Sequence, residues 1–166
     1  MLDSSMLSKR YEVRRLDSAD ADDILRLCRE NTLYYQYCGL EATKAAILND
    51  LQLTPPGVER SDKYYVGFYR DGDLAAIMDL IDGYPSSDMA FIGFFMMNAA
   101  LQGKGLGTGI VQDVCAYLKH SGKTSIRLAV AEDNPQANHF WKKNGFRIVD
   151  KAPMDGWTAL VAEKTL

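Results

Sequence analysis

The chain has 166 residues, of which 47% are hydrophobic, 10% aromatic and 25% charged, and its formal net charge is −3. This length and composition exclude long disorder, collagen-like repeats and disulfide miniproteins, and they predict one folded domain spanning residues 1–166. The negative net charge offers no basic field for a phosphate backbone, so nucleic acid is not an expected partner.

The three cysteines, Cys28, Cys38 and Cys115, are widely spaced and form no CxxC pair. We therefore expect reduced thiols and no metal site. Residues 1–10 lack the apolar centre of a signal peptide, and no apolar run approaches the about 18 residues that span a bilayer. We expect a cytoplasmic protein without membrane contact, in which residues 1–10 form a flexible N-terminal segment.

The first third of the chain predicts one strand and two helices. Residues 11–16 have the composition of a strand, and Asp17 or Ser18 can cap a following helix with one apolar side. Thr43 can cap a second helix, which ends before the Pro-Pro-Gly sequence at 55–57.

The middle of the chain predicts three consecutive antiparallel strands. Two β-rich segments between residues 64 and 81 flank Asp71-Gly72, a dipeptide typical of a hairpin turn. Residues 89–97 form a nearly continuous apolar run, as expected of a strand covered on both faces. A helix over 107–120 and a strand over 125–131 follow, and a strand, helix, strand passage normally forms a parallel pair.

A last short helix carries Ala137, Phe140 and Trp141 on one side, and two further strands complete the chain. The predicted order is βααβββαβαββ. The fold class is therefore α/β (α+β): a mixed, mostly antiparallel sheet of about seven strands with helices on both faces.

Four glycines alternate along residues 102–109, where the apolar strand passes into a helix. Glycine lets the main chain come close to a ligand, and successive N–H groups at a helix N-terminus form a concavity with partial positive charge. Such a loop favours a phosphate or pyrophosphate. The spacing fits neither a GxGxxG dinucleotide motif nor a Walker A loop, so it indicates neither NAD nor ATP.

Gln102, Gly105 and Gly107 form a Gln-x-x-Gly-x-Gly pattern, which resembles the acyl-CoA loop of the GNAT superfamily of N-acyltransferases. Residues 134–146 are similar to a second segment of that superfamily: an Asn, then Ala three residues on, an aromatic residue seven on, and Gly-Phe after eleven and twelve. With the order of the elements, the resemblance covers residues 11–164, nearly the whole chain.

The resemblance implies that acetyl-CoA binds where the fourth and fifth strands separate at a bulge. The pantetheine arm of coenzyme A would lie along the main chain of the fourth strand, and the pyrophosphate would meet the N–H groups of residues 103–108. The implied cofactor-binding residues are Phe95, Met96, Met97, Gln102, Gly103, Lys104, Gly105, Gly107, Thr108, Asn134, Phe140 and Trp141. Core packing is the alternative for Phe140 and Trp141, and a solvated surface position is the alternative for Lys104.

The reaction implied is direct attack of a neutral amine on the thioester, through a tetrahedral oxyanion, in a ternary complex. An alkylamine has a pKa of about 10.4, so holding it neutral at pH 7 costs roughly 4 to 5 kcal/mol, which desolvation or a base must meet. A main-chain N–H near Phe95 is the expected oxyanion donor. Many relatives carry a tyrosine where this chain has Trp141, and that tyrosine protonates the departing thiolate. In this chain either another tyrosine or water must supply the proton.

The fourth strand offers no carboxylate. Asp79 on the third strand, with Tyr84 nearby, is therefore the candidate for catalytic proton removal, although a solvent-facing strand position is its alternative. Asp82, Tyr34 and Tyr35 are candidates for substrate binding, because the resemblance places the connection between the first two helices at the acceptor pocket and tyrosine rings attract cations. Asp82 can instead be a turn residue, and the tyrosines can pack beneath a loop.

We expect an N-acetyltransferase that acetylates the primary amine of a small molecule. Two alternatives stay open. One is a protein or peptide N-acetyltransferase, which needs an open groove. The other is an acyl-CoA-binding regulatory module with little turnover, which is consistent with Trp141 in place of the usual catalytic tyrosine. The identity of the amine, the preferred acyl chain and a homodimeric state also stay open.

Overall fold

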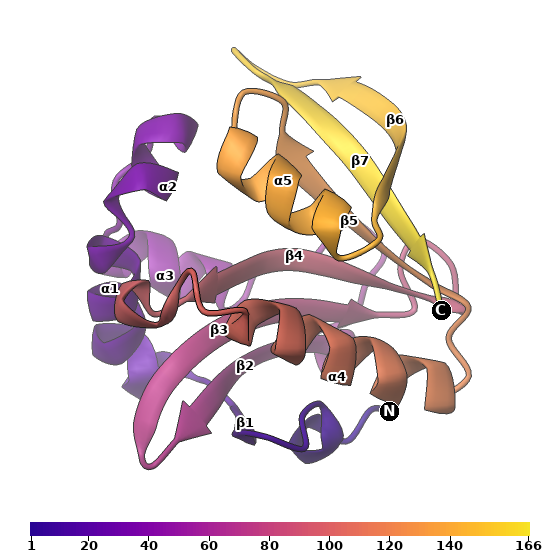
Figure 1. Cartoon of the computed structure of the whole chain (residues 1–166), viewed down its shortest axis with the longest axis horizontal. Coiled ribbons are helices and arrows are strands. Elements are labelled where there is room, and N and C mark those ends of the chain that lie inside the picture. The colour runs from indigo at the N-terminus through magenta and orange to yellow at the C-terminus, as the bar shows by residue number, and fades with distance from the viewer.

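A seven-stranded sheet in the order β1-β2-β3-β4-β5-β7-β6 forms the centre of the computed structural model, which describes residues 1–166 (Figure 1). Only β4 and β5 are parallel neighbours, and every other pair is antiparallel. The predicted fold class is confirmed. The strands are β1 (Glu12–Arg15), β2 (Lys63–Arg70), β3 (Asp73–Asp82), β4 (Met89–Met97), β5 (Ser125–Ala131), β6 (Arg147–Pro153) and β7 (Thr158–Thr165).

Helices cover both faces of this sheet. The cores show that α4 and α5 pack on one face, whereas α1 and α3 pack on the other. None of the helices combines the length and apolar character needed to cross a membrane. The α-helices are α1 (Ala21–Glu30), α2 (Thr32–Cys38), α3 (Lys44–Asp50), α4 (Leu106–His120) and α5 (Pro135–Lys143), and the 3-10 turns are η1 (Ser4–Met6), η2 (Ser18–Asp20), η3 (Arg60–Asp62) and η4 (Ala99–Leu101).

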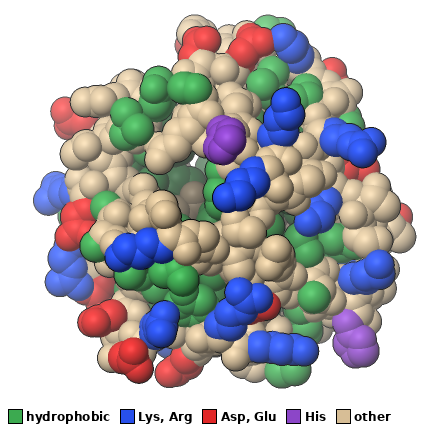
Figure 2. Space-filling view, in the orientation of Figure 1, with side chains coloured by type: hydrophobic (Ala, Val, Ile, Leu, Met, Phe, Trp, Pro, Cys, Tyr) green, Lys and Arg blue, Asp and Glu red, His purple; other side chains and the backbone are tan.

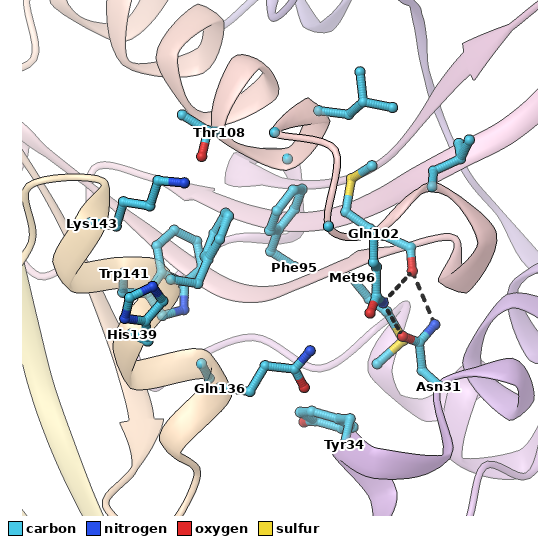
Figure 3. A pocket seen from close by; sticks show the side chains of 18 of the residues that line it. Asn31, Tyr34, Phe95, Met96, Gln102, Thr108, Gln136, His139, Trp141 and Lys143 are labelled. Atoms are coloured by element: carbon cyan, nitrogen blue, oxygen red, sulfur yellow. Dashed lines mark hydrogen bonds between the residues drawn. The ribbon is translucent and has the colours of Figure 1, made fainter.

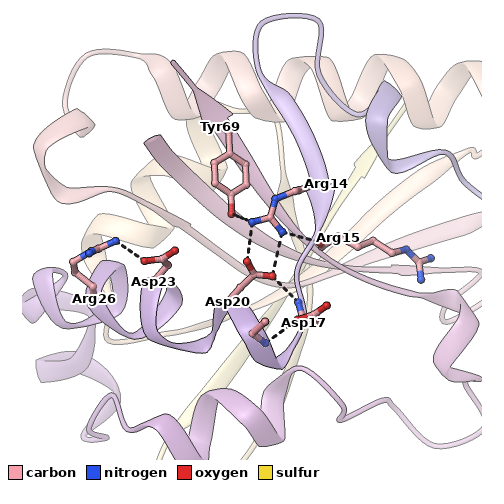
Figure 4. A network of polar contacts seen from close by, with 8 residues as sticks. Arg14, Arg15, Asp17, Asp20, Asp23, Arg26 and Tyr69 are labelled. Carbon is pink, nitrogen blue, oxygen red and sulfur yellow. Dashed lines mark hydrogen bonds and ion pairs between the residues drawn. The ribbon is translucent and has the colours of Figure 1, made fainter. Parts of the chain in front are cut away.

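A polar network at the start of α1 holds this helix to the sheet (Figure 4). Arg14 on β1 donates to Asp20 Oδ1 at 2.7 Å and to the hydroxyl of Tyr69 on β2, also at 2.7 Å. The Arg14 guanidinium lowers the pKa of Asp20. Asp17 and Asp20 form a capping box around η2, which leads directly into α1.

Two segments differ from expectation. Residues 31–38 were expected as a connection, but Thr32–Cys38 form α2, which ends at Gly39 in the left-handed conformation with a φ of 65°. Residues 1–10, expected to be flexible, lie against the sheet and α4. Leu7 is fully buried, and Ser8 donates from Oγ to Asp113 at 2.8 Å. An apolar side chain in the core fixes this segment.

A bulge on β4 determines where the sheet opens. Phe94 is opposite Asp79 and Ile92 is opposite Leu80, so Gly93 between them has no partner on β3. The parallel pairing of β4 with β5 also stops at Ile92, which is opposite Leu128. Residues 93–97 therefore present an unpaired strand edge toward β5.

The phase of the β3–β4 ladder decides which main-chain groups face this gap. Asn98 donates from its N–H to the Ala75 carbonyl oxygen at 2.8 Å, and main-chain groups alternate in direction along an antiparallel strand. The N–H and C=O groups of Phe95 and Met97 therefore point toward the gap. Those of Met96, which was expected to bind the pantetheine arm, point toward β3.

Candidate active site

A cleft of about 340 Å³ lies where β4 and β5 separate, between the β4 edge, the glycine loop and α5 (Figure 3). In the space-filling view the surface is hollowed between α2 and α5 (Figure 2). All the predicted cofactor-binding residues except Lys104 line this cleft. Lys104 instead donates from Nζ to the Ala100 carbonyl oxygen at 3.0 Å. Four further polar residues line the cleft and were not predicted from the sequence: Asn31, Gln136, His139 and Lys143.

The glycine loop presents a row of free donors to the cleft. The main-chain N–H groups of residues 103–108 donate no hydrogen bond within the protein, and the last three belong to the first turn of α4. Gly103 and Gly105 both have a φ of 73°, a conformation that side chains with a Cβ rarely adopt. Six consecutive free N–H groups at the positive end of a 15-residue helix form a site for a phosphate or diphosphate.

The side chain of Asn31, at the end of α1, connects this loop to the helices across the cleft. Its buried amide donates to the carbonyl oxygens of Leu27 at 2.9 Å and Met97 at 3.0 Å. Gln102 donates from Nε2 to Asn31 Oδ1 and also to the Met97 oxygen at 3.2 Å. Gln102 therefore fixes the loop to the end of β4, and the Met97 carbonyl group is already occupied.

Aromatic rings close one end of the cleft. The Phe95 and Phe140 rings stack at 5.9 Å, and Trp141 lies edge-on to Phe140 at 4.9 Å and to Phe146 at 5.1 Å. Trp141 is only 9% exposed, so it belongs to the core and lines the cleft at the same time. Asn134 caps α5 by accepting from the Ala137 N–H at 3.0 Å, and its Nδ2 donates no hydrogen bond within the protein.

A second cavity, of about 600 Å³, lies on the face of the sheet covered by α1 and α3. Tyr34 lines both this cavity and the cleft, whereas Tyr35 lines the cavity alone. The Tyr34 ring packs edge-on against Tyr35 at 5.1 Å and against Phe94 at 5.5 Å. Burial raises the pKa of Tyr34 to about 12. Tyr34 thus forms the wall at which cleft and cavity meet, and Tyr35 packs against it on the side of the cavity.

Asp79 lies in this second cavity and not in solvent. Its Oδ2 forms an ion pair with Lys63 Nζ at 2.6 Å, and the two side chains are 15% and 4% exposed. Its Oδ1 is buried and has no hydrogen-bond partner. Burial raises the pKa of Asp79, the Lys63 ammonium partly offsets this effect, and the charge of Asp50 adds to the increase. One buried carboxylate oxygen is therefore left without a partner inside the protein.

The structure does not bring the other two acceptor-side candidates to this cavity. Asp82 forms an ion pair with Lys123, and Tyr84 packs edge-on against Phe91 at 5.5 Å. Neither lines the cleft or the cavity. Side chains alternate between the faces of a strand, so Asp82, three residues after Asp79, lies on the opposite face of β3.

A strand pair that separates next to a glycine loop is the arrangement expected of an acyl-CoA-dependent acyltransferase. The model of the acetyltransferase (GNAT) family matches residues 24–146. The chain belongs to this family of acyltransferases.

Comparisons with individual proteins agree with this assignment. The crystal structure of an acetyltransferase from Thermus thermophilus has a TM-score of 0.78, with 22% identity over 93% of this chain and 96% of that one. The PaiA N-acetyltransferase of Thermoplasma acidophilum, solved in complex with coenzyme A, has a TM-score of 0.68, with 19% identity over 93% of this chain and 98% of that one. At these identities, the two structures show a shared fold.

One curated relative also matches. An uncharacterized N-acetyltransferase of Methanocaldococcus jannaschii is 27% identical over 90 residues, which is 54% of this chain. The matched stretch spans 39% of that relative's length.

Proposed function

We propose that the protein transfers an acetyl group from acetyl-CoA to the primary amine of a small molecule within a ternary complex. The observation that carries this proposal is the junction of two sites at Tyr34: a cleft with free main-chain donors, and a cavity with a buried carboxylate. The first suits an anionic thioester and the second suits an amine.

Coenzyme A fits the donors of the cleft. The free N–H groups of residues 103–108 would hold its pyrophosphate, and the side chain of Asn134 would donate to its extended arm. The open N–H and C=O groups of Phe95 and the N–H group of Met97 would pair with the amides of that arm as a neighbouring strand does. The coenzyme A complex of the Thermoplasma acidophilum relative supports this assignment. When bound, acetyl-CoA supplies an acyl group activated as a thioester.

Asp79 is the proposed acceptor of the amine proton. Its buried Oδ1 has no partner within the protein and would accept a hydrogen bond from an ammonium group that displaced the side chains covering it, and its raised pKa makes it a stronger base than an ordinary aspartate. Loss of water in the cavity lowers the pKa of the amine, while the carboxylate and the aromatic rings raise it, so proton removal by Asp79 has to meet most of the roughly 4 to 5 kcal/mol that a neutral amine costs at pH 7. The main-chain N–H of Phe95 is the proposed donor to the thioester oxygen.

Trp141 cannot protonate the departing thiolate, and Tyr34 is the only tyrosine that lines the cleft. Its pKa of about 12 decides how it acts. A thiol has a pKa of about 8.5, so proton transfer from Tyr34 to the thiolate would be uphill by about 5 kcal/mol. We therefore propose that Tyr34 stabilises the thiolate by donating a hydrogen bond and that water supplies the proton.

A small acceptor is favoured over a peptide because the cavity has walls on several sides. Residues of α2, α3 and the loop at 53–56 line it together with β2, β3 and β4. A peptide acceptor would need a groove open along its length.

The test is release of the free coenzyme A thiol from acetyl-CoA with a panel of small amines, together with calorimetric binding of coenzyme A. Turnover with a small amine and its loss in Asp79→Asn are expected. Tight coenzyme A binding without turnover of any amine or peptide would replace the transferase with a binding module. Turnover of peptides alone would replace the small acceptor.

A further inference from the structure

The second cavity, which Tyr34 separates from the cleft, is lined by more carboxylates than the one needed to remove a proton from the amine. Asp50, Asp79 and Glu41 line it, and Lys63 is its only cationic side chain. The Lys63 side chain is 4% exposed and its ammonium group is bound to Asp79. No cation of the cavity is therefore free to bind a carboxylate or phosphate of the acceptor.

Asp50, at the end of α3, is the second carboxylate that matters. Its side chain forms no hydrogen bond or ion pair within the protein and lines the cavity from an exposed position, where partial burial raises its pKa and the charge of Lys63 lowers it. The charge of Asp50 also raises the pKa values of Tyr34, Tyr65 and Asp79, which lie around the cavity. Its carboxylate therefore acts on the interior of the cavity and has no cation bound directly to it.

The remaining walls are aromatic and suit a cation. Tyr65 already lies under an ammonium group, because Lys63 Nζ is 5.7 Å from the centre of its ring. The other aromatic side chains that line the cavity are Tyr34, Tyr35, Phe91 and Phe94. Its volume of about 600 Å³ is within the range of small-molecule sites, about 300 to 1,000 Å³.

We propose that the acceptor is a diamine or a longer polyamine, whose reacting amine lies at Asp79 while a second ammonium group pairs with Asp50. This inference rests on the proposed function and specifies its substrate class. A monoamine would leave the Asp50 carboxylate to solvent and gain nothing from its charge. An amino acid or a phosphorylated amine would bring a negative charge into a cavity that has no free cation.

Three probes that differ only at the far end test this proposal: 1,4-diaminobutane, 1-aminobutane and 4-aminobutanoate end in an ammonium, a methyl and a carboxylate group. We expect kcat/KM for the diamine to exceed that for the monoamine by about tenfold or more, the effect of one additional ion pair of about 1.4 kcal/mol, with the carboxylate compound slowest. Asp50→Asn should reduce the ratio of diamine to monoamine to near one. Glu59→Gln, which removes an exposed carboxylate outside the cavity, should leave the ratio unchanged.

Calorimetric binding of the same probes separates the two proposals, because it needs no turnover. Binding of the diamine that is weakened by Asp50→Asn supports the inference even if the acetyl-transfer assay fails, in which case only the proposed function is overturned. Equal kcat/KM for diamine and monoamine, or a diamine preference that persists in Asp50→Asn, overturns the inference and leaves the transferase in place. Faster turnover of 4-aminobutanoate overturns it as well.

Discussion

Asp79 on β3 occupies the space that Gly93 on β4 leaves free. A Cβ atom added to Gly93 would lie 2.9 Å from Asp79 Oδ2, closer than real Cβ atoms approach other atoms. Gly93 is also the unpaired residue of the β4 bulge. β4 has no carboxylate of its own, and at Gly93 it leaves room for the carboxylate of Asp79 on β3.

Gly93→Ala should therefore reduce the reaction with amines more than it reduces coenzyme A binding. The added methyl group would push Asp79 Oδ2 away from Lys63 and turn the carboxylate out of position. We expect kcat/KM for the amine to fall by about tenfold or more, the effect of roughly 1.4 kcal/mol, while the dissociation constant of coenzyme A stays within a factor of about two. An unchanged kcat/KM would contradict the role of Asp79.

The acid side of the pH profile should depend on Lys63. Asp79 must be ionised to accept a proton, and its pKa lies above the usual range, so kcat/KM should fall as the pH falls through that raised value. The Lys63 ammonium lowers this pKa, so Lys63→Met should move the acid limb to higher pH. An acid limb that stays in place would show that another group titrates.

The same variant bears on stability. Lys63→Met leaves the buried Asp79 carboxylate unpaired, which should lower the free energy of unfolding at pH 7 by about 3 to 5 kcal/mol. Because the raised pKa of Asp79 favours its protonated form in the folded state, this loss should diminish as the pH falls below that pKa. Urea unfolding at several pH values measures both effects, and a loss independent of pH would contradict the assignment.

The glycine loop can be tested by charge. Gly105→Glu places a carboxylate among the free N–H groups of residues 103–108, so coenzyme A binding should weaken by about a hundredfold or more, equal to about 2.7 kcal/mol. The matched control is Gly156→Glu. Gly156 also has a positive φ with no atom near an added Cβ, and it lies outside the cleft. Both variants carry backbone strain of about 1 to 2 kcal/mol, so calorimetry separates loss of binding from strain. Unchanged coenzyme A binding in Gly105→Glu would overturn the loop assignment.

Asn31 and Gln102 should act as a unit. Asn31→Ala removes the donor to the Met97 carbonyl and the acceptor for Gln102, which should reduce the free energy of unfolding by about 1 to 3 kcal/mol and weaken coenzyme A binding. Gln102→Ala should have a smaller additional effect in the Asn31→Ala background than in the unaltered protein. Fully additive effects on coenzyme A binding would show that the two side chains act separately.

Elements with local signals could be predicted from the sequence. The Asp71-Gly72 turn lies between β2 and β3, and Thr43 caps α3 by accepting from the Ala46 N–H at 3.1 Å. The alternating glycines mark the loop at the cleft for the same reason: the conformation that they permit is a property of a few adjacent residues. The helix α2 was missed because no apolar repeat marks it and its tyrosines have no strong helix preference.

The acceptor side could be predicted only in part, because its residues come together through distant contacts. Asn31 meets Met97 across 66 positions of the sequence, and the ion pair of Lys63 with Asp79 joins two strands. Nothing local to Asp50 distinguishes it from a solvated helix end. Strand alternation, however, already separates Asp79 from Asp82, and applying it to β3 would have left Asp82 out of the acceptor set.

The unpaired stretch of β4 has a consequence for association as well as for binding. A free strand edge normally invites another polypeptide, which is how sheets aggregate. Here the edge lies inside the sheet, enclosed by α5 and the start of α4 in a cleft of about 340 Å³. A narrow extended molecule fits such an opening more readily than a strand with bulky side chains. The fold thus keeps the free edge of β4 open to a ligand while preventing it from pairing with a strand of another copy of the chain.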